Sequence, residues 1–239
     1  MRNDYKLLIF DWDGTLADSI GRIVEAMHVA SQRSGFDLCD DLAVKGIIGL
    51  GLPEAIRTLY PQISDAELVA FRQHYADHYI ALEAEPSPLF DGVVESLAAF
   101  RDQGYHLAVA TGKARRGLDR VWGSTGLGKW FDGSRCADES RSKPHPDMVL
   151  ELLAELGHAP EQTLVVGDTS FDLEMAERAG VDRVEQLVAR PIEESIRGMP
   201  EVKRIRTTVR PGFAFTYVDL YPTVESEKIP IVWQRLRSR

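Results

Sequence analysis

Three short apolar runs, each followed by polar residues, constrain the fold of this chain more than any other feature of its sequence. The runs are Leu7–Phe10, Tyr105–Ala110 and Thr163–Val166. Continuous apolar runs of this length are typical of strands buried on both faces, as in a parallel sheet. Helical patterns alternate with these runs along the chain, so we expect an α/β fold with a doubly wound parallel sheet.

A long segment between the first and second runs has no strand pattern. Over residues 18–85, apolar residues recur three and four positions apart, which indicates helices. The sequence Pro86-Ser87-Pro88 marks the end of this segment. We therefore predict an all-helical cap over residues 19–85, inserted into a Rossmann-like core made of residues 1–18 and 86–183.

Composition and charge exclude several classes of protein. The chain has 239 residues, of which 44% are apolar, and a formal net charge of −9. This acidic balance argues against nucleic-acid binding, which needs a concentrated basic surface. Cys39 and Cys136 show neither a disulfide framework nor the spacing of zinc ligands. Because no apolar run suits a signal peptide or a membrane span, we expect a cytoplasmic protein without a membrane partner. Its oligomeric state is left open.

The predicted strands end in acidic and hydroxyl side chains. Asp11 and Asp13 follow the first strand, Thr111 follows the second, and Asp168 and Asp172 follow the third. Parallel strands would bring these residues to one edge of the sheet. A loop stiffened by Pro144 and Pro146 could aim Lys143 at the same place. Four carboxylates so close together would repel one another, so we expect a hard divalent cation, Mg²⁺, among them.

Such a cluster contains the groups needed for phosphoryl transfer to a carboxylate. Asp11 would attack phosphorus and form an aspartyl-phosphate. Asp13 would protonate the leaving oxygen and then deprotonate the attacking water. The Gly14 amide, Thr111 and Lys143 would hold the equatorial oxygens of the phosphoryl group. The sequence thus predicts phosphate-ester chemistry at this edge of the sheet.

Four motifs carry a resemblance to a known family. They are Phe10-Asp11-Trp12-Asp13-Gly14-Thr15-Leu16-Ala17-Asp18-Ser19, Val109-Ala110-Thr111-Gly112-Lys113, Ser142-Lys143-Pro144 and Gly167-Asp168-Thr169-Ser170-Phe171-Asp172. In this order, over residues 5–182, they resemble the motifs of the haloacid dehalogenase-like hydrolase superfamily. The helical insertion between the first two motifs is similar to the cap of the phosphoglycolate-phosphatase-like branch. The resemblance implies a phosphoric monoester hydrolase with a Rossmann-like fold.

The resemblance also implies roles for the site residues. Asp11 is implied as nucleophile and metal ligand, and Asp13 as general acid and base and as a metal ligand through its carbonyl oxygen. Asp168 and Asp172 are implied as further metal ligands. Phosphate binding is assigned to Gly14, Thr111, Gly112 and Lys143. The implied cofactor is Mg²⁺, and the implied partner is a small phosphorylated substrate.

We therefore predict a Mg²⁺-dependent phosphatase that hydrolyses a small phosphorylated metabolite, with phosphoglycolate as the first candidate, through an aspartyl-phosphate intermediate. Two alternatives stay open, namely a phosphomutase of sugar phosphates and a catalytically inactive chimeric protein. Cap closure would exclude water, and we expect substrate contacts from Gly46–Leu52 and from Arg57. By contrast, we interpret Lys113, Arg115 and Arg116 as a solvated helix start, and His145 as a structural or exposed residue.

Residues 184–239 differ in charge from the rest of the chain. They carry 10 Lys and Arg against 7 Asp and Glu, a balance of +3, whereas residues 1–183 carry 18 against 30, a balance of −12. The pattern predicts a helix over 184–196, a hairpin of Val202–Val209 and Phe213–Tyr221, and a helix over Ile231–Leu236. This order supplies no further apolar strand, so we expect the edge of the sheet to be unfinished.

This atypical α+β tail resembles part of the periplasmic porter domain of resistance-nodulation-division efflux transporters. The resemblance is carried by residues 185–194, by Arg210-Pro211-Gly212-Phe213 and by residues 233–237. The stretch includes no membrane helix, so we infer no transport function from it. Our hypothesis is that the chain is a chimera in which residues 184–239 are foreign to the enzyme.

Overall fold

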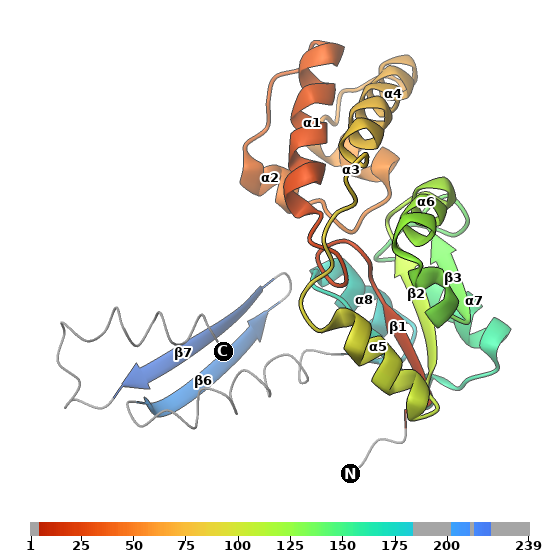
Figure 1. The fold of residues 1–239 in the computed structure, drawn as a ribbon. Helices are drawn as coiled ribbons and strands as arrows, with labels where there is room; N and C mark the ends of the chain where they lie inside the picture. Colours follow the sequence, from red (N-terminus) through yellow and green to blue (C-terminus); the bar gives the residue numbers. More distant parts are fainter. Residues whose placement is uncertain (1–4, 184–201, 211–212, 221–239) are drawn as a thin grey trace. The chain divides into compact units, whose positions relative to one another are not determined.

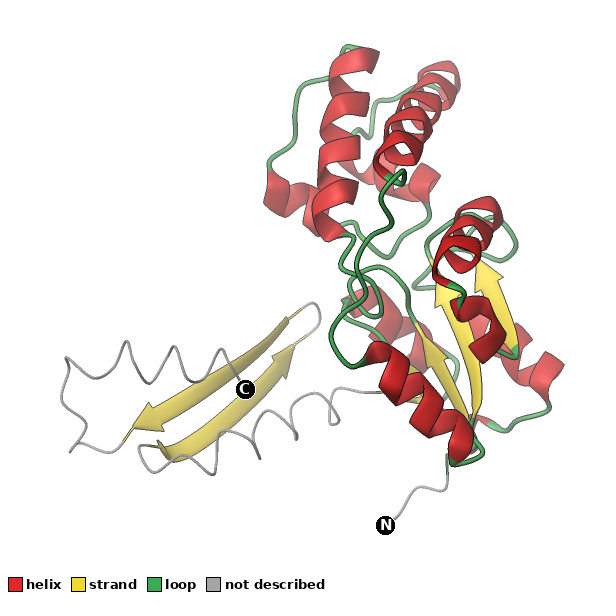
Figure 2. Ribbon diagram, viewed as in Figure 1, coloured by secondary structure: helices red, strands yellow, loops and turns green. Residues whose placement is uncertain are grey.

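Figures 1 and 2 show a computed structural model that describes residues 5–183, 202–210 and 213–220. The chain divides into two compact units, Met1–Arg183 and Val184–Arg239. The first unit contains a parallel sheet, the helices that cover it and a separate group of helices. The described part of the second unit is a β-hairpin. All of the predicted site residues lie in the first unit.

The sheet consists of five parallel strands in the order β3-β2-β1-β4-β5. The strands are β1 (Leu7–Phe10), β2 (His106–Thr111), β3 (Gly133–Cys136), β4 (Thr163–Val166) and β5 (Asp182–Arg183). β1 is the central strand, and all of its residues are buried. Burial on both faces explains its continuous apolar run. The predicted doubly wound parallel sheet is confirmed.

Helices cover both faces of the sheet. The helical elements of the core are α5 (Val93–Asp102), α6 (Arg115–Thr125), the 3-10 turns η1 (Leu127–Trp130) and η2 (Pro160–Gln162), α7 (Asp147–Leu156) and α8 (Ser170–Arg178). Leu7 and Ile9 pack in one apolar cluster with residues of α7 and α8. Because strand side chains alternate between faces, Phe10 points the other way, with its ring 6.2 Å from the Phe100 ring of α5.

The tail led us to expect an unfinished edge of the sheet, and this expectation is wrong because the edge has a further strand, β5. β5 pairs with β4, so that Asp182 lies opposite Leu164 and Arg183 lies opposite Val165. Gly180, with a φ of 70°, lets the chain turn back to the sheet after α8. The two residues of β5 are charged, and therefore no apolar run indicates this strand in the sequence.

The segment between β1 and α5 folds into four helices. They are α1 (Ile20–Ser34), α2 (Asp41–Lys45), α3 (Leu52–Leu59) and α4 (Asp65–Leu82). α1 and α4 lie side by side (Figure 1). These helices enclose an apolar cluster of their own, in which the Phe71 ring is fully buried. α4 begins with a capping box in which Ser64 and Glu67 satisfy each other's backbone N–H groups.

The two linkers between the cap helices and the sheet are held together. Ala17 and Leu89 form an antiparallel bridge. The Asp18 N–H donates to the Pro88 carbonyl at 2.8 Å, and the Phe90 N–H donates to the Leu16 carbonyl at 3.1 Å. The chain therefore enters and leaves the cap through one joint.

In the second unit, β6 (Val202–Arg210) and β7 (Phe213–Leu220) pair antiparallel, as the predicted hairpin requires. The helices predicted over 184–196 and 231–236 lie outside the described residues. Within the described part of the chain, no helix has the length and apolar character needed to cross a membrane.

Candidate active site

The ends of three neighbouring strands bring the predicted acidic residues to one edge of the sheet. Asp11 directly follows β1, and Asp168 follows β4 after one glycine. The Asp11 N–H donates to the Val166 carbonyl at 2.8 Å, which ties the two strand ends together. Thr111 is the last residue of β2, the strand on the other side of β1. The side chains of Asp11 and Thr111 are buried.

Lys143 is buried among the carboxylates, although its loop lies far from them in the sequence. Its Nζ lies 2.6 Å from Asp11 Oδ1 and 2.6 Å from Asp172 Oδ1. Burial alone would lower the pKa of Lys143, but the two carboxylates raise it above its ordinary value. Burial raises the pKa of the Asp11 carboxyl well above its usual range, and the Lys143 charge opposes this effect. Lys143 therefore compensates only part of the negative charge at the site.

Three carboxylates could hold a cation here. Asp11, Asp168 and Asp172 each offer an oxygen atom, and these atoms lie within 4.8 Å of one another. Asp11 Oδ2 is buried and has no hydrogen-bond partner among the described residues. A buried carboxylate oxygen without a partner is costly unless a cation meets it. The donor set is all oxygen, which suits a hard divalent ion such as Mg²⁺.

Asp13 turns away from this group of carboxylates. Its Oδ1 accepts a hydrogen bond from Ser19 Oγ at 2.5 Å and lies 3.0 Å from Lys113 Nζ. Lys113 is only 10% exposed, and its ammonium also donates to the Tyr79 hydroxyl of α4 at 3.1 Å. The interpretation of Lys113 as a solvated helix start is therefore wrong. The tight turn after β2 directs Lys113 back towards Asp13, and its place two residues after Thr111 is the signal that could have identified it.

The charges around the site do not cancel. With all four carboxyl groups ionised, Asp11, Asp13, Asp168 and Asp172 face two ammonium groups (Lys113 and Lys143), which leaves a formal charge of two negative units. Although burial lowers it, the pKa of Lys113 is raised by Asp13 and by the neighbouring tyrosines, so this ammonium stays charged. The remaining negative charge matches a divalent cation.

Two predicted phosphate-binding glycines lie where a side chain would not fit. Gly14 has a φ of 83°, and a Cβ there would lie 2.3 Å from Asp168 Oδ2. A Cβ on Gly112 would lie 2.5 Å from the Leu50 carbonyl oxygen, which belongs to the cap loop. The buried Thr111 hydroxyl accepts the Lys113 N–H at 3.2 Å. Its own hydrogen has no acceptor among the described residues.

Asp172 makes contacts both in the first turn of α8 and with Lys143. Its Oδ2 accepts from the Thr169 N–H at 3.1 Å and from Thr169 Oγ1 at 2.7 Å, which caps α8. Its Oδ1 accepts from Lys143. Gly167 makes this approach possible, because a Cβ there would lie 2.3 Å from Asp172 Cγ. Asp172 thus anchors both α8 and Lys143.

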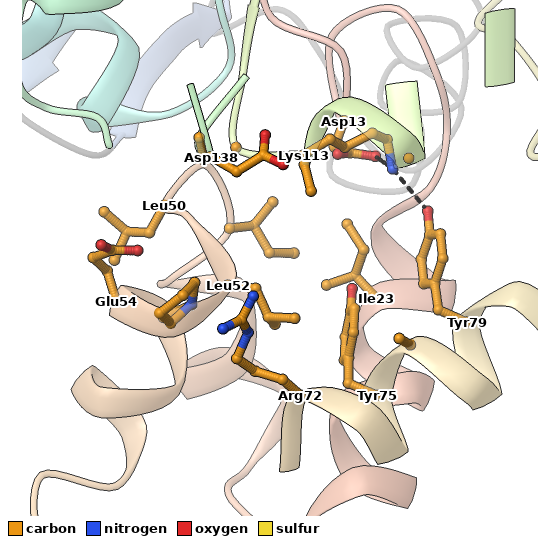
Figure 3. A pocket seen from close by; sticks show the side chains of 18 of the residues that line it. Asp13, Ile23, Leu50, Leu52, Glu54, Arg72, Tyr75, Tyr79, Lys113 and Asp138 are labelled. Carbon is orange, nitrogen blue, oxygen red and sulfur yellow. Dashed lines mark hydrogen bonds and ion pairs between the residues drawn. The ribbon is translucent and has the colours of Figure 1, made fainter. Parts of the chain in front are cut away.

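A cavity of about 340 Å³ lies between the cap and the core, and Asp11 and Asp13 form part of its wall. Figure 3 shows Asp13 at the core end of this cavity. Its cap side includes Leu50 and Leu52 from the predicted contact segment. Arg57 is not part of the wall, because its guanidinium pairs with Asp65 on the surface of the cap. This corrects the prediction for Arg57. The sequence reasoning also missed the cavity-lining residues of α4, which are Arg72, Tyr75, Ala76, Tyr79 and Ile80.

The remaining basic candidates lie away from the carboxylates. Arg115 pairs with Glu139 at 2.8 Å, whereas Arg116 is exposed and lines the cavity from α6. His145 Nδ1 lies 3.0 Å from Asp147 at the start of α7. His145 therefore has the local structural contact that the sequence suggested.

Known proteins are similar to this chain in sequence and in fold. The protein named "Probable phosphatase IndB" from Dickeya dadantii is 37% identical over 179 residues, which cover 73% of this chain and 78% of that protein. A plasmid-borne phosphoglycolate phosphatase from Cupriavidus necator is 32% identical over 182 residues, which cover 73% and 77%. A crystal structure described as a haloacid dehalogenase-like hydrolase from Bacteroides fragilis matches with a TM-score of 0.70 and 28% identity, over 75% of this chain and 86% of that one.

The family model for these enzymes matches residues 8–185, which include all four motifs. The match ends at the start of the tail, so the resemblance of residues 184–239 to efflux transporters stays a prediction. Family, fold and the cluster of carboxylates at the strand ends agree with one another. The chain belongs to the haloacid dehalogenase-like hydrolases.

Proposed function

We propose that the chain is a Mg²⁺-dependent phosphatase that hydrolyses a small phosphorylated metabolite through an aspartyl-phosphate on Asp11. The observation that carries this proposal is the buried Asp11 Oδ2, which has no partner among the described residues, in a carboxylate that lines the cavity. Oδ1 of the same carboxylate is held by Lys143 at 2.6 Å. One oxygen is thus fixed, while the other has no competing hydrogen bond.

The first step transfers the phosphoryl group to the protein. An oxygen of Asp11 forms a bond to phosphorus as the bond between phosphorus and the ester oxygen breaks. Asp13, which carries a proton when the substrate binds, donates it to the departing oxygen, which leaves as an alcohol. Ser19 and Lys113 hold the Asp13 carboxyl beside the cavity for this transfer. Lys143 and the Thr111 hydroxyl offer hydrogens to the oxygens of the phosphoryl group.

The second step restores the enzyme. A water molecule attacks phosphorus and gives its proton to Asp13, which is now a carboxylate. The bond between phosphorus and Asp11 breaks, and inorganic phosphate leaves. Asp13 thus returns to its protonated form and Asp11 to its carboxylate form. Both groups line the cavity, so the same two residues serve both steps.

Asp11, Asp168 and Asp172 would hold the cation, and the resemblance adds the carbonyl oxygen of Asp13. When bound, Mg²⁺ supplies positive charge that offsets the carboxylates and the phosphoryl oxygens. The chain itself limits access of water. The Gly49 and Leu50 backbone lies against Gly112, so the cap loop covers one side of the cavity.

The test measures release of inorganic phosphate from 4-nitrophenyl phosphate with Mg²⁺, with EDTA, and with the Asp11→Asn variant. We expect Mg²⁺-dependent release by the native protein, almost none with EDTA, and none by the variant. Folded protein that releases no phosphate with Mg²⁺ would contradict the proposal. Isomerisation of a sugar phosphate without release would indicate a phosphomutase instead. Because a curated relative is named a phosphoglycolate phosphatase, phosphoglycolate is the first natural compound to assay.

A further inference from the structure

The wall of the cavity changes character from the core to the cap. At the core end it includes the carboxylates of Asp11 and Asp13. The cap contributes a mostly apolar surface from α1, α3, α4 and the loop before α3, made of Ile23, Met27, Ile47, Ile48, Leu50, Leu52, Ala76 and Ile80. A volume of about 340 Å³ falls within the range of pockets that enclose whole small-molecule ligands. The cavity therefore has room for a leaving group with an apolar body.

Arg72 stands out on this surface. It lines the cavity from α4, beside Tyr75, and Figure 3 shows its guanidinium directed into the cavity near Leu52. Among the described residues, no hydrogen bond or ion pair engages its side chain, and it is exposed. A guanidinium offers five N–H donors in a planar fork that matches a carboxylate or a phosphate.

Each other charged group of the cavity wall is paired with a neighbour, carries a negative charge or lies on the core side of the cavity. Lys113 is paired with Asp13 at 3.0 Å, and Arg120 is paired with Glu83 at 2.8 Å. Asp138 accepts the Arg115 N–H at 2.8 Å. Glu54 lines the cavity from α3, and Arg116 lines it from α6 on the core side. Arg72 is thus the cation of the cap wall that is available to a ligand.

We propose that the substrate is a phosphomonoester whose leaving group has an apolar or aromatic body and, at its far end, an anionic group that binds Arg72. This inference rests on the proposed function, because it places the phosphate at Asp11. The apolar surface would contact the body, and the stacked rings of Tyr75 and Tyr79, 5.6 Å apart, offer an aromatic face for a flat group. Arg72 is then a specificity residue that binds substrate without taking part in bond breaking.

The experiment uses synthetic aryl phosphates that differ at the end remote from the phosphate. The anionic series is 4-phosphooxybenzoate, 4-phosphooxyphenylacetate and 3-(4-phosphooxyphenyl)propanoate, and each compound is paired with its neutral carboxamide. KM and kcat are measured for the native full chain, for Arg72→Met, and for Arg72→Lys. Arg116→Met is the matched control, because it removes an exposed arginine from the core side of the same cavity.

We expect at least one carboxylate to have a KM about tenfold lower than its carboxamide, as a charge-assisted contact of roughly 1.4 kcal/mol gives. Arg72→Met should abolish this preference while kcat changes less than about threefold, and Arg72→Lys should keep part of it. Arg116→Met should leave it unchanged. The ratio of KM values within each substrate pair is compared between the native chain and each variant. This comparison cancels the intrinsic difference in leaving-group reactivity between carboxylate and carboxamide.

Three results would overturn the inference and leave the proposed function intact. The first is an equal KM for every carboxylate and its carboxamide. The second is a preference for the carboxylate that remains in Arg72→Met. The third is a preference for the carboxylate that is lost in Arg116→Met instead. In each of these cases the neutral carboxamides would still be hydrolysed. If no aryl phosphate were hydrolysed by the folded protein, the proposed function would fail, and this inference with it.

Discussion

The two ends of the cavity are built on different principles. At the core end, charged groups are buried and paired: Lys143 joins Asp11 and Asp172, and Lys113 joins Asp13. At the cap end, the wall is mostly apolar, and Arg72 is exposed and unpaired among the described residues. Buried ion pairs tolerate little movement, because a displaced partner leaves an uncompensated charge. The side chains at the core end therefore tolerate little displacement, whereas substitutions at the cap end should reduce the stability of the protein only slightly.

Removing Lys143 should have the largest effect. In Lys143→Met, Asp11 and Asp172 lose their shared cation, and breaking a buried pair in this way costs about 3–5 kcal/mol. We expect kcat for 4-nitrophenyl phosphate to fall at least about a hundredfold. We also expect metal-free protein to unfold at lower urea concentration. Lys45→Met, at an exposed position of the cap, is the control, and near-native turnover by Lys143→Met would contradict the comparison.

A methyl group on Gly14 should weaken metal binding. The added Cβ would lie 2.3 Å from Asp168 Oδ2, at a φ of 83° that side chains rarely adopt. We expect Gly14→Ala to raise the Mg²⁺ concentration for half-maximal activity about ten- to a hundredfold, because the added methyl group would displace the Asp168 carboxylate. The matched control is Gly21→Ala, whose added Cβ has open space around it. Unchanged Mg²⁺ dependence in Gly14→Ala would argue against Asp168 as a ligand.

Loss of the contacts that Lys113 makes with Asp13 and with Tyr79 of the cap should reduce kcat by an intermediate factor. Lys113→Met leaves Asp13 with Ser19 as its remaining partner, so we expect kcat to fall about tenfold. Tyr79→Phe removes only the hydroxyl that Lys113 contacts at 3.1 Å, and we expect about a threefold fall. The fall in Lys113→Met should be greater for an alkyl phosphate than for 4-nitrophenyl phosphate, because the nitrophenolate needs less protonation. An equal fall for both substrates would mean that Lys113 does not act through Asp13.

Changes on the apolar cap wall should have the smallest effect on turnover. Leu52→Ala removes part of the surface assigned to the leaving-group body. We expect KM for an aryl phosphate to rise about three- to tenfold, while kcat stays within about twofold. Leu42→Ala, which changes an 80% exposed leucine of the cap, should alter neither constant. A fall in kcat without a change in KM for Leu52→Ala would show that the cap wall contributes to the chemistry.

The same contrast explains what the sequence could predict. The sequence predicts Asp11, Thr111 and Asp168 because each lies within one or two positions of an apolar run, and the parallel sheet then brings them together. The place of Arg72 depends on how the cap helices meet the core, which no local pattern encodes. Lys113, in contrast, has a local signal, because it lies two residues after Thr111. Arg57 was misplaced because helical spacing does not indicate which neighbour a surface arginine will pair with. β5 was missed because its two residues are charged and only backbone pairing defines it.

The joint between cap and core has a consequence for how such enzymes can diversify. Residues 17 and 89 are bridged, and the Asp18 N–H meets the Pro88 carbonyl at 2.8 Å. From the side of the core, the whole cap therefore starts and ends at a single point, as a surface turn would. A recombination event that exchanges the gene segment for residues 19–85 leaves the strand register of the core untouched. The core can thus keep its catalytic residues while a different cap, with a different substrate preference, replaces residues 19–85.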